Sequence, residues 1–189
     1  MTNNICTPKQ MLRQNILSEY SDEELIKVYD IEASITFIEA IIDGIPYPVP
    51  QRTLITCRLE DGREFRLYSV PIDIVEMIRK IKGYNTYMEE EFNDDRETLY
   101  DIILTTPNAI DALGRHLRRV VIDSINPETY TYSATAEFGE DKMIIRRKMI
   151  PSHAILLALI THRPIYIRKV LVDQQEEFRE ESEEDLDIF

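Results

Sequence analysis

The stretch that decides the fold is KMIIRRKMIPSHAILLALITHRPIYIRKV, from Lys142 to Val170. The part before Pro151 is charged but compatible with β-structure, so it predicts a strand. Pro151 suits the first turn of a helix, where its missing N–H is not needed, and residues 154–160 are apolar on every side. A short helix of this kind has to be buried. Pro164 blocks continuation of the helix, and residues 165–167 (Ile-Tyr-Ile) predict a returning strand. The stretch therefore predicts a core unit of strand, buried helix and strand.

Upstream, the sequence adds antiparallel strands and amphipathic helices. Apolar and polar residues alternate between residues 25 and 42, as in a half-buried strand, whereas residues 44–50 hold three prolines and predict a loop. Two further strands meet at Asp61-Gly62, a dipeptide that supplies the positive φ of a tight hairpin turn. Pro71 starts a helix with an apolar stripe, and more helices and a meander of strands follow. The predicted fold class is α+β, an antiparallel-rich mixed sheet packed with a few helices.

The stretch that decides the fold also carries a family resemblance. Residues 150–154 read Ile-Pro-Ser-His-Ala, an apolar helix follows, and residues 164–167 read Pro-Ile-Tyr-Ile. This resembles the C-terminal signature of the bifunctional nuclease (BFN) domain, which reads Arg-Pro-Ser-Asp-Ala, an apolar helix and Pro-Ile-Tyr-Val. The resemblance extends from about Leu54 to Val170. The signature's Arg is Ile150 here and its Asp is His153, so both charges are absent together, which is typical of a structural ion pair replaced by neutral groups.

The resemblance implies a small α+β domain with nuclease activity on DNA or RNA. Phosphodiester hydrolysis needs charge neutralisation on the phosphate and an activated water, which carboxylates holding Mg²⁺ or Mn²⁺ and a basic residue normally supply. The implied catalytic residues are Asp73, Asp101 and His153, the implied metal ligands are Asp73 and Asp101, and the implied substrate-binding residues are Arg96, Arg115 and Ser152. The alternative is a structural role, in which Asp73 and Asp101 cap or pair on helices and His153 lies at the edge of the core.

A second class of function is a non-catalytic interaction protein that keeps the fold. Residues 173–189 include nine acidic residues and one Arg, and the acidic run directly precedes the apolar residues Leu186, Ile188 and Phe189. These three would bind a pocket on a protein partner while the acidic run steers its approach. The tip resembles the acidic, Phe-terminated tails of bacterial single-stranded DNA-binding proteins. The alternative is a helix continuing from Leu171 that ends in a solubilising tail.

Charge, cysteine spacing and the length of the apolar runs limit which partners and which location we expect. With 35 acidic and 22 basic residues the net charge is −13, which argues against passive binding to nucleic-acid phosphates. The two cysteines lack metal or redox spacing, and no apolar run approaches the ~20 residues that span a bilayer. We therefore expect a cytoplasmic protein without membrane contact, and a homo-oligomer because many strand edges need cover. The expected parts are an N-terminal extension with a docked helix (1–24), a BFN-like α+β domain (25–172) and an acidic C-terminal tail (173–189).

Overall fold

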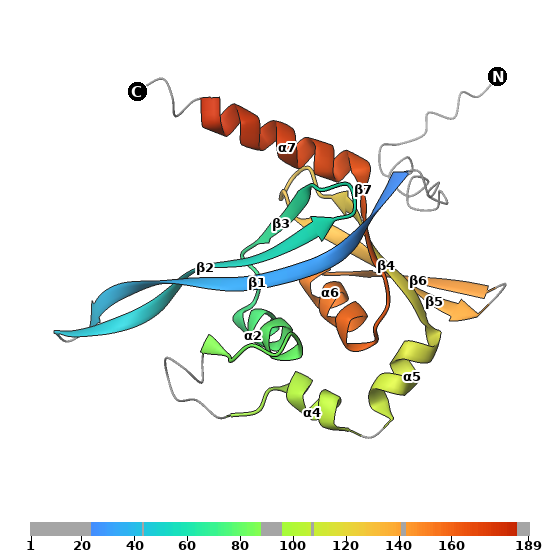
Figure 1. Ribbon diagram of the computed structural model, residues 1–189, viewed down its shortest axis with the longest axis horizontal. Coiled ribbons are helices and arrows are strands. Elements are labelled where there is room, and N and C mark those ends of the chain that lie inside the picture. The colour runs from blue at the N-terminus through green and yellow to red at the C-terminus, as the bar shows by residue number, and fades with distance from the viewer. Residues whose placement is uncertain (1–23, 43, 88–95, 107, 141–142, 185–189) are drawn as a thin grey trace, which may run out of the picture.

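The computed structural model describes residues 24–42, 44–87, 96–106, 108–140 and 143–184 of the chain (Figure 1). The docked helix expected within residues 1–24, and the tail residues Leu186, Ile188 and Phe189, fall outside this part of the chain.

A seven-stranded sheet forms the centre of the molecule, in the order β3-β2-β1-β7-β4-β5-β6. The strands are β1 (Leu25–Ile42), β2 (Ile45–Leu59), β3 (Glu64–Tyr68), β4 (Leu117–Ile125), β5 (Tyr132–Glu140), β6 (Met143–Met149) and β7 (Ile165–Arg168). Neighbouring strands are antiparallel except β4 and β7, which run parallel. The sheet is therefore mixed and mostly antiparallel, and together with the helices it confirms the predicted α+β class.

Two helices pack against one face of this sheet to enclose the core. The described helices are α2 (Ile72–Ile81), α4 (Leu99–Thr105), α5 (Ala109–His116), α6 (Pro151–Ile160) and α7 (Lys169–Glu184). Helices α2 and α6 contact each other and the sheet, and Figure 1 shows α4 and α5 further out on the same side, with α7 across the sheet from them. Phe65, Ile74 and Ile155 are fully buried between these layers.

The stretch that decides the fold forms β6, α6 and β7, as predicted. Helix α6 is buried along most of its length and β7 lies inside the sheet, because both carry apolar side chains on the faces they present to the core. Strand β6 differs, since it is the edge strand and most of its side chains are exposed. The predicted core unit is therefore wrong for this strand, whose three consecutive cations, Arg146, Arg147 and Lys148, favour an edge position.

Strand β7 joins two halves of the sheet. It pairs with β1 at residues 25–27 and with β4 at residues 120–122. One half consists of β3, β2 and β1, and the other of β4, β5 and β6. In the part of the chain that the structure describes, no other strand connects the halves, so the four residues of β7 complete the sheet.

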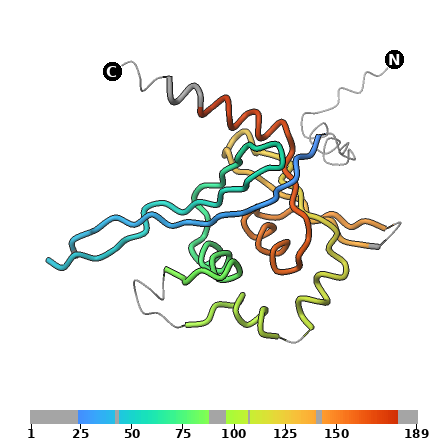
Figure 2. Tube along the Cα trace, in the orientation of Figure 1, coloured from blue at the N-terminus to red at the C-terminus, as the bar shows by residue number. Residues whose placement is uncertain are grey.

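The hairpin of β1 and β2 extends well beyond the helices, as the Cα trace in Figure 2 shows. Its outer part, in which residues 37–42 pair with residues 45–50, is called the arm below. The loop predicted over residues 44–50 is therefore wrong, because β2 begins at Ile45 and runs through all three prolines. Proline is tolerated in a strand where its nitrogen faces away from the neighbouring strand. The three prolines are two residues apart, so the nitrogens of all three can face away from β1.

Helix α7 covers the outer edge of β3. The Gln175 side chain accepts a hydrogen bond from the Arg66 backbone N–H (2.7 Å) and donates one to the Arg66 carbonyl (2.9 Å), as a residue of a neighbouring strand would. The Arg63 guanidinium also binds the carboxylates of Asp173 (2.7 Å) and Glu176 (3.0 Å). The first part of the predicted acidic tail is therefore a helix docked on the sheet.

None of the helices in the described residues combines the length and the apolar character needed to cross a bilayer.

Candidate functional site

A cavity of about 460 Å³ lies between α2 and the segment that leads into α4, and it contains three of the predicted site residues. Asp73, Arg96 and Asp101 all line it. The other lining residues are Ile72, Glu76, Met77, Lys80, Thr86, Glu97 and Thr98. Four carboxylates and two cations thus surround a space with an apolar wall, which can hold a small polar ligand but repels an uncompensated phosphate.

Asp101 is placed in this cavity by the start of α4. Thr98 is the N-cap, and the Asp101 carboxylate accepts hydrogen bonds from the Thr98 backbone N–H (2.9 Å) and hydroxyl (2.8 Å), while Thr98 Oγ1 accepts from the Asp101 N–H (3.3 Å). This reciprocal arrangement is a capping box, which satisfies backbone donors at the start of a helix. The second Asp101 oxygen accepts from Lys80 Nζ at 2.7 Å. One Asp101 oxygen therefore stabilises the start of α4, and the other links α4 to α2.

The environment of Asp101 keeps its carboxylate ionised. Burial raises the pKa of Asp101, but the hydrogen bonds from Lys80 and Thr98 outweigh burial and leave the pKa below its ordinary value of 3.8. The side chain is only 11% exposed, so it cannot turn toward a ligand without losing these bonds. The arrangement matches the structural alternative raised by the sequence, in which Asp101 caps and pairs.

The predicted metal site lacks a sufficient set of donors among the described residues. Asp73 and Asp101 line the same cavity, but in the described residues no three side chains from His, Cys, Asp or Glu lie close enough together to hold one metal ion. Mg²⁺ requires near-ideal octahedral oxygen ligation, and both Asp101 oxygens already accept hydrogen bonds. The described residues therefore do not fit a preformed Mg²⁺ or Mn²⁺ site.

His153 lies beside the cavity rather than in its lining. It occupies the first turn of α6, and its Nδ1 is 3.4 Å from the Tyr100 hydroxyl oxygen. Burial and, to a lesser degree, the negative charge of Asp73 raise the pKa of Tyr100. Tyr100 is thus the group that links His153 to the Asp73 side of the cavity.

The remaining two predicted residues lie elsewhere. Ser152 is buried and lines an apolar groove with Tyr68, Tyr130 and Ile150. Arg115 lines a separate cavity between α5 and the end of α6. The structure therefore brings together Asp73, Arg96 and Asp101, places His153 next to them, and separates Ser152 and Arg115 from the group.

Sequence reasoning missed Lys80, Thr98 and Tyr100. The Thr98-x-x-Asp101 spacing is a readable capping-box signal, so Thr98 could have been found. Lys80 and Tyr100 acquire their roles only when α2, α4 and α6 come together, and no local pattern marks them.

No protein-family model matches the chain, and no curated protein matches it either. The resemblance to the BFN domain stays a prediction that rests on the sequence alone.

Proposed function

We propose that the protein is a non-catalytic interaction protein built on a BFN-like α+β domain. The observation that carries this proposal is the state of Asp101, whose two carboxylate oxygens are occupied by Thr98 and Lys80. A metal-dependent nuclease needs carboxylates that are free to hold the ion or to activate water. Here the carboxylate at the implied centre stabilises the packing of two helices.

The altered signature supports the same proposal. Ile150, which stands where the BFN signature has Arg, is 62% exposed, and His153 contacts Tyr100 instead of a cation. Neither position holds a buried charge, so the fold has no need of the family's ion pair. On this proposal the scaffold is kept, while Asp101, which the resemblance assigns to chemistry, caps α4 and pairs with Lys80 on α2.

A nuclease assay with metal controls tests this proposal. Purified protein is incubated with single-stranded and duplex DNA and RNA in Mg²⁺, Mn²⁺ or EDTA. We expect no cleavage above that of a protein carrying both Asp73→Asn and His153→Ala. Metal-dependent cleavage that these substitutions abolish would contradict the proposal.

A second candidate is a weak metal-dependent nuclease, favoured by the presence of Asp73, Asp101 and Arg96 in one cavity. In that case Arg96 would bind a phosphate, Asp73 would supply the negative charge that acts on Tyr100, and His153 would accept a proton. Asp73→Asn separates the candidates when it is compared with Asp111→Asn. Asp111 is also an acidic residue in the first turn of a helix, but it lines a different cavity. Cleavage lost only with Asp73→Asn would establish the nuclease.

A further inference from the structure

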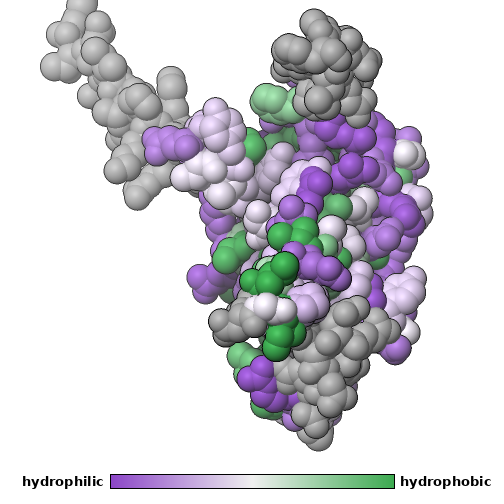
Figure 3. Space-filling model, turned by 90° about the vertical axis from the view of Figure 1, so that its left-hand side faces the viewer, coloured by the Kyte–Doolittle hydropathy of each residue, from purple (hydrophilic) through white to green (hydrophobic). Residues whose placement is uncertain are grey.

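Beyond Phe37, whose ring packs against Tyr87, the arm exposes apolar side chains on a segment without a core beneath it. Ile41 is 79% exposed, Ile45 65% and Ile38 46%, and the view onto the end of the arm in Figure 3 shows apolar residues gathered there. An isolated two-stranded hairpin is only marginally stable in water, and contiguous exposed apolar surface marks an interaction site. The arm therefore needs a partner.

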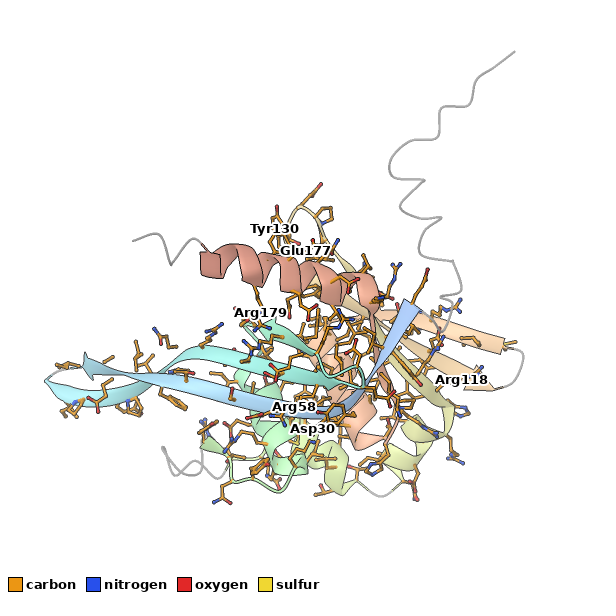
Figure 4. The ribbon with its side chains drawn as sticks, turned by 45° about the horizontal axis from the view of Figure 1, so that its top comes forward. Asp30, Arg58, Arg118, Tyr130, Glu177 and Arg179 are labelled. Carbon is orange, nitrogen blue, oxygen red and sulfur yellow. The ribbon has the colours of Figure 1, made fainter. Side chains whose placement is uncertain are left out.

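Charge distinguishes the arm from the rest of its hairpin. Nearer the body, Arg58 on β2 binds Asp30 (3.1 Å) and Glu32 (2.8 Å) on β1, and Figure 4 shows Asp30 and Arg58 side by side. Along the paired residues of the arm, Glu39 is the one ionisable acid and no Lys or Arg occurs. Nucleic acid would not be held there, because its binding depends on Lys and Arg.

The two edges of the arm differ in their capacity to add a strand. Proline has no N–H, so Pro46, Pro48 and Pro50 can pair with β1 only at positions whose backbone faces outward. These prolines leave the outer edge of β2 without donors at alternate residues. A further strand cannot extend the ladder on that edge.

The outer edge of β1 lacks this protection. In an antiparallel ladder the two members of a non-hydrogen-bonded pair both turn their backbone groups outward. Glu39 faces Pro48 and Ile41 faces Pro46, so Glu39 and Ile41 present their N–H and C=O groups to the outer edge of β1. In the described residues, no strand pairs with this side of β1 beyond Lys27.

We propose that the arm is a dimerisation element, in which the outer edges of β1 from two copies of this chain pair antiparallel across a two-fold axis. A second copy fits because two chains of net charge −13 repel each other except where surfaces of low charge meet, and the arm is such a surface. Because only the β1 edge of the arm can add a strand, pairing of two copies uses both open edges and the assembly stops at a dimer. If the β2 edge were open as well, further copies could add and form a filament. This inference is independent of whether the cavity is catalytic.

The other open edge of the sheet does not compete for this pairing. Strand β6 carries Arg146, Arg147 and Lys148 in succession, and pairing it with another β6 would bring like charges together. The arm is therefore the edge at which two copies meet with the least repulsion.

Light scattering of the full chain tests the proposal. We expect a mass twice the 22.2 kDa of one chain at micromolar concentration. Glu39→Pro with Ile41→Pro removes two outward donors and leaves the ladder with β2 intact, so this variant should be monomeric or dissociate at least tenfold more readily. The matched control, Glu39→Gln with Ile41→Val, keeps both backbone donors and should stay dimeric. A monomeric parent protein, or a fully dimeric double-proline variant, overturns the proposal.

Cross-linking provides a second test that does not depend on the folding of the proline variant. Ile38 and Ala40 face β2 with their backbones, so across the two-fold axis they lie at non-hydrogen-bonded positions, where Cα atoms are about 4.5 Å apart and a disulfide can form. In a Cys6→Ser background, at least one of Ile38→Cys, Ala40→Cys and the variant with both cysteines should oxidise to a covalent dimer, because a two-fold axis places only one residue of β1 opposite its own copy. Tyr47→Cys, across the ladder from Ala40 but on β2, is the control and should not. No covalent dimer from any of the β1 variants, or oxidation of Tyr47→Cys to the same extent, would show that the β1 edges do not meet.

Discussion

Glu137 carries the buried charge whose loss should be costly. Its side chain is 3% exposed, and its oxygens accept hydrogen bonds from Arg119 Nε (2.6 Å) on β4 and Arg146 Nε (3.0 Å) on β6. Glu137→Gln keeps the shape but removes the charge and turns one acceptor into an NH₂ group facing a guanidinium. Removing one partner of a buried ion pair costs about 3–5 kcal/mol. Because the arginine side chains are 25% and 31% exposed and can regain water, we expect about 3 kcal/mol.

Urea denaturation followed by circular dichroism measures this loss. The control is Arg147→Gln on the same strand as Arg146, since Arg147 is exposed, and its free energy of unfolding should change by less than about 0.5 kcal/mol. If the free energy of unfolding of Glu137→Gln lies within about 0.5 kcal/mol of that of the parent protein, the reasoning is refuted.

The same variant predicts a pH dependence. Burial raises the pKa of Glu137, but the hydrogen bonds from Arg119 and Arg146 outweigh burial and hold the pKa below its ordinary value of 4.5. A carboxylate with a depressed folded-state pKa contributes its full stability above the unfolded-state pKa and loses it as pH falls through the folded-state pKa. The stability difference between parent and variant should therefore be constant above pH 4.5 and shrink below it. A difference that grows on acidification would contradict this account.

Three further predictions follow from burial and hydrogen bonding. Gln175→Ala should lower the free energy of unfolding by about 1–3 kcal/mol and speed hydrogen exchange of the Arg66 amide, measured by mass spectrometry, because it uncovers the edge of β3. Unchanged protection of this amide would show that the rest of α7 is enough to cover the edge. Burial raises the pKa of Cys57 to about 12, so in a Cys6→Ser protein iodoacetamide at pH 8 should label Cys57 only after unfolding, and rapid labelling of the native protein would contradict its burial. Ile155→Ala should lower the free energy of unfolding by about 2–5 kcal/mol, because Ile155 is fully buried in α6, and a loss under 1 kcal/mol in a urea titration would mean that the site collapses around the smaller side chain.

Local sequence signals predict the elements of this fold well and their placement less well. Pro151 and the apolar run after it predict α6, and Asp61-Gly62 predicts the turn between β2 and β3. The loop assigned to residues 44–50 fails because proline counts against a strand only where its nitrogen faces the ladder, and the direction of the backbone depends on register. The edge position of β6 likewise depends on which strands become its neighbours.

The candidate site shows the same limit. The resemblance selects Asp73, Arg96 and Asp101, and the structure places all three around one cavity. That selection could not reveal that Lys80 occupies one oxygen of Asp101, because Lys80 lies on α2 and reaches Asp101 only through tertiary packing. The resemblance thus selects three residues that lie together, but not Ser152 and Arg115, and the availability of each oxygen depends on the folded surroundings.

The position of β7 has a consequence for biosynthesis. The ribosome delivers the N-terminal strands first, yet Leu25 has no neighbour on the β7 side until Arg168 has been made. Contacts between residues so distant in the chain form late, because the entropy of closing the intervening loop must be overcome first. From the synthesis of Met149 until that of β7, a nascent chain of this protein therefore carries two half-sheets with bare edges, and a chaperone that shields strand edges would matter most during that interval.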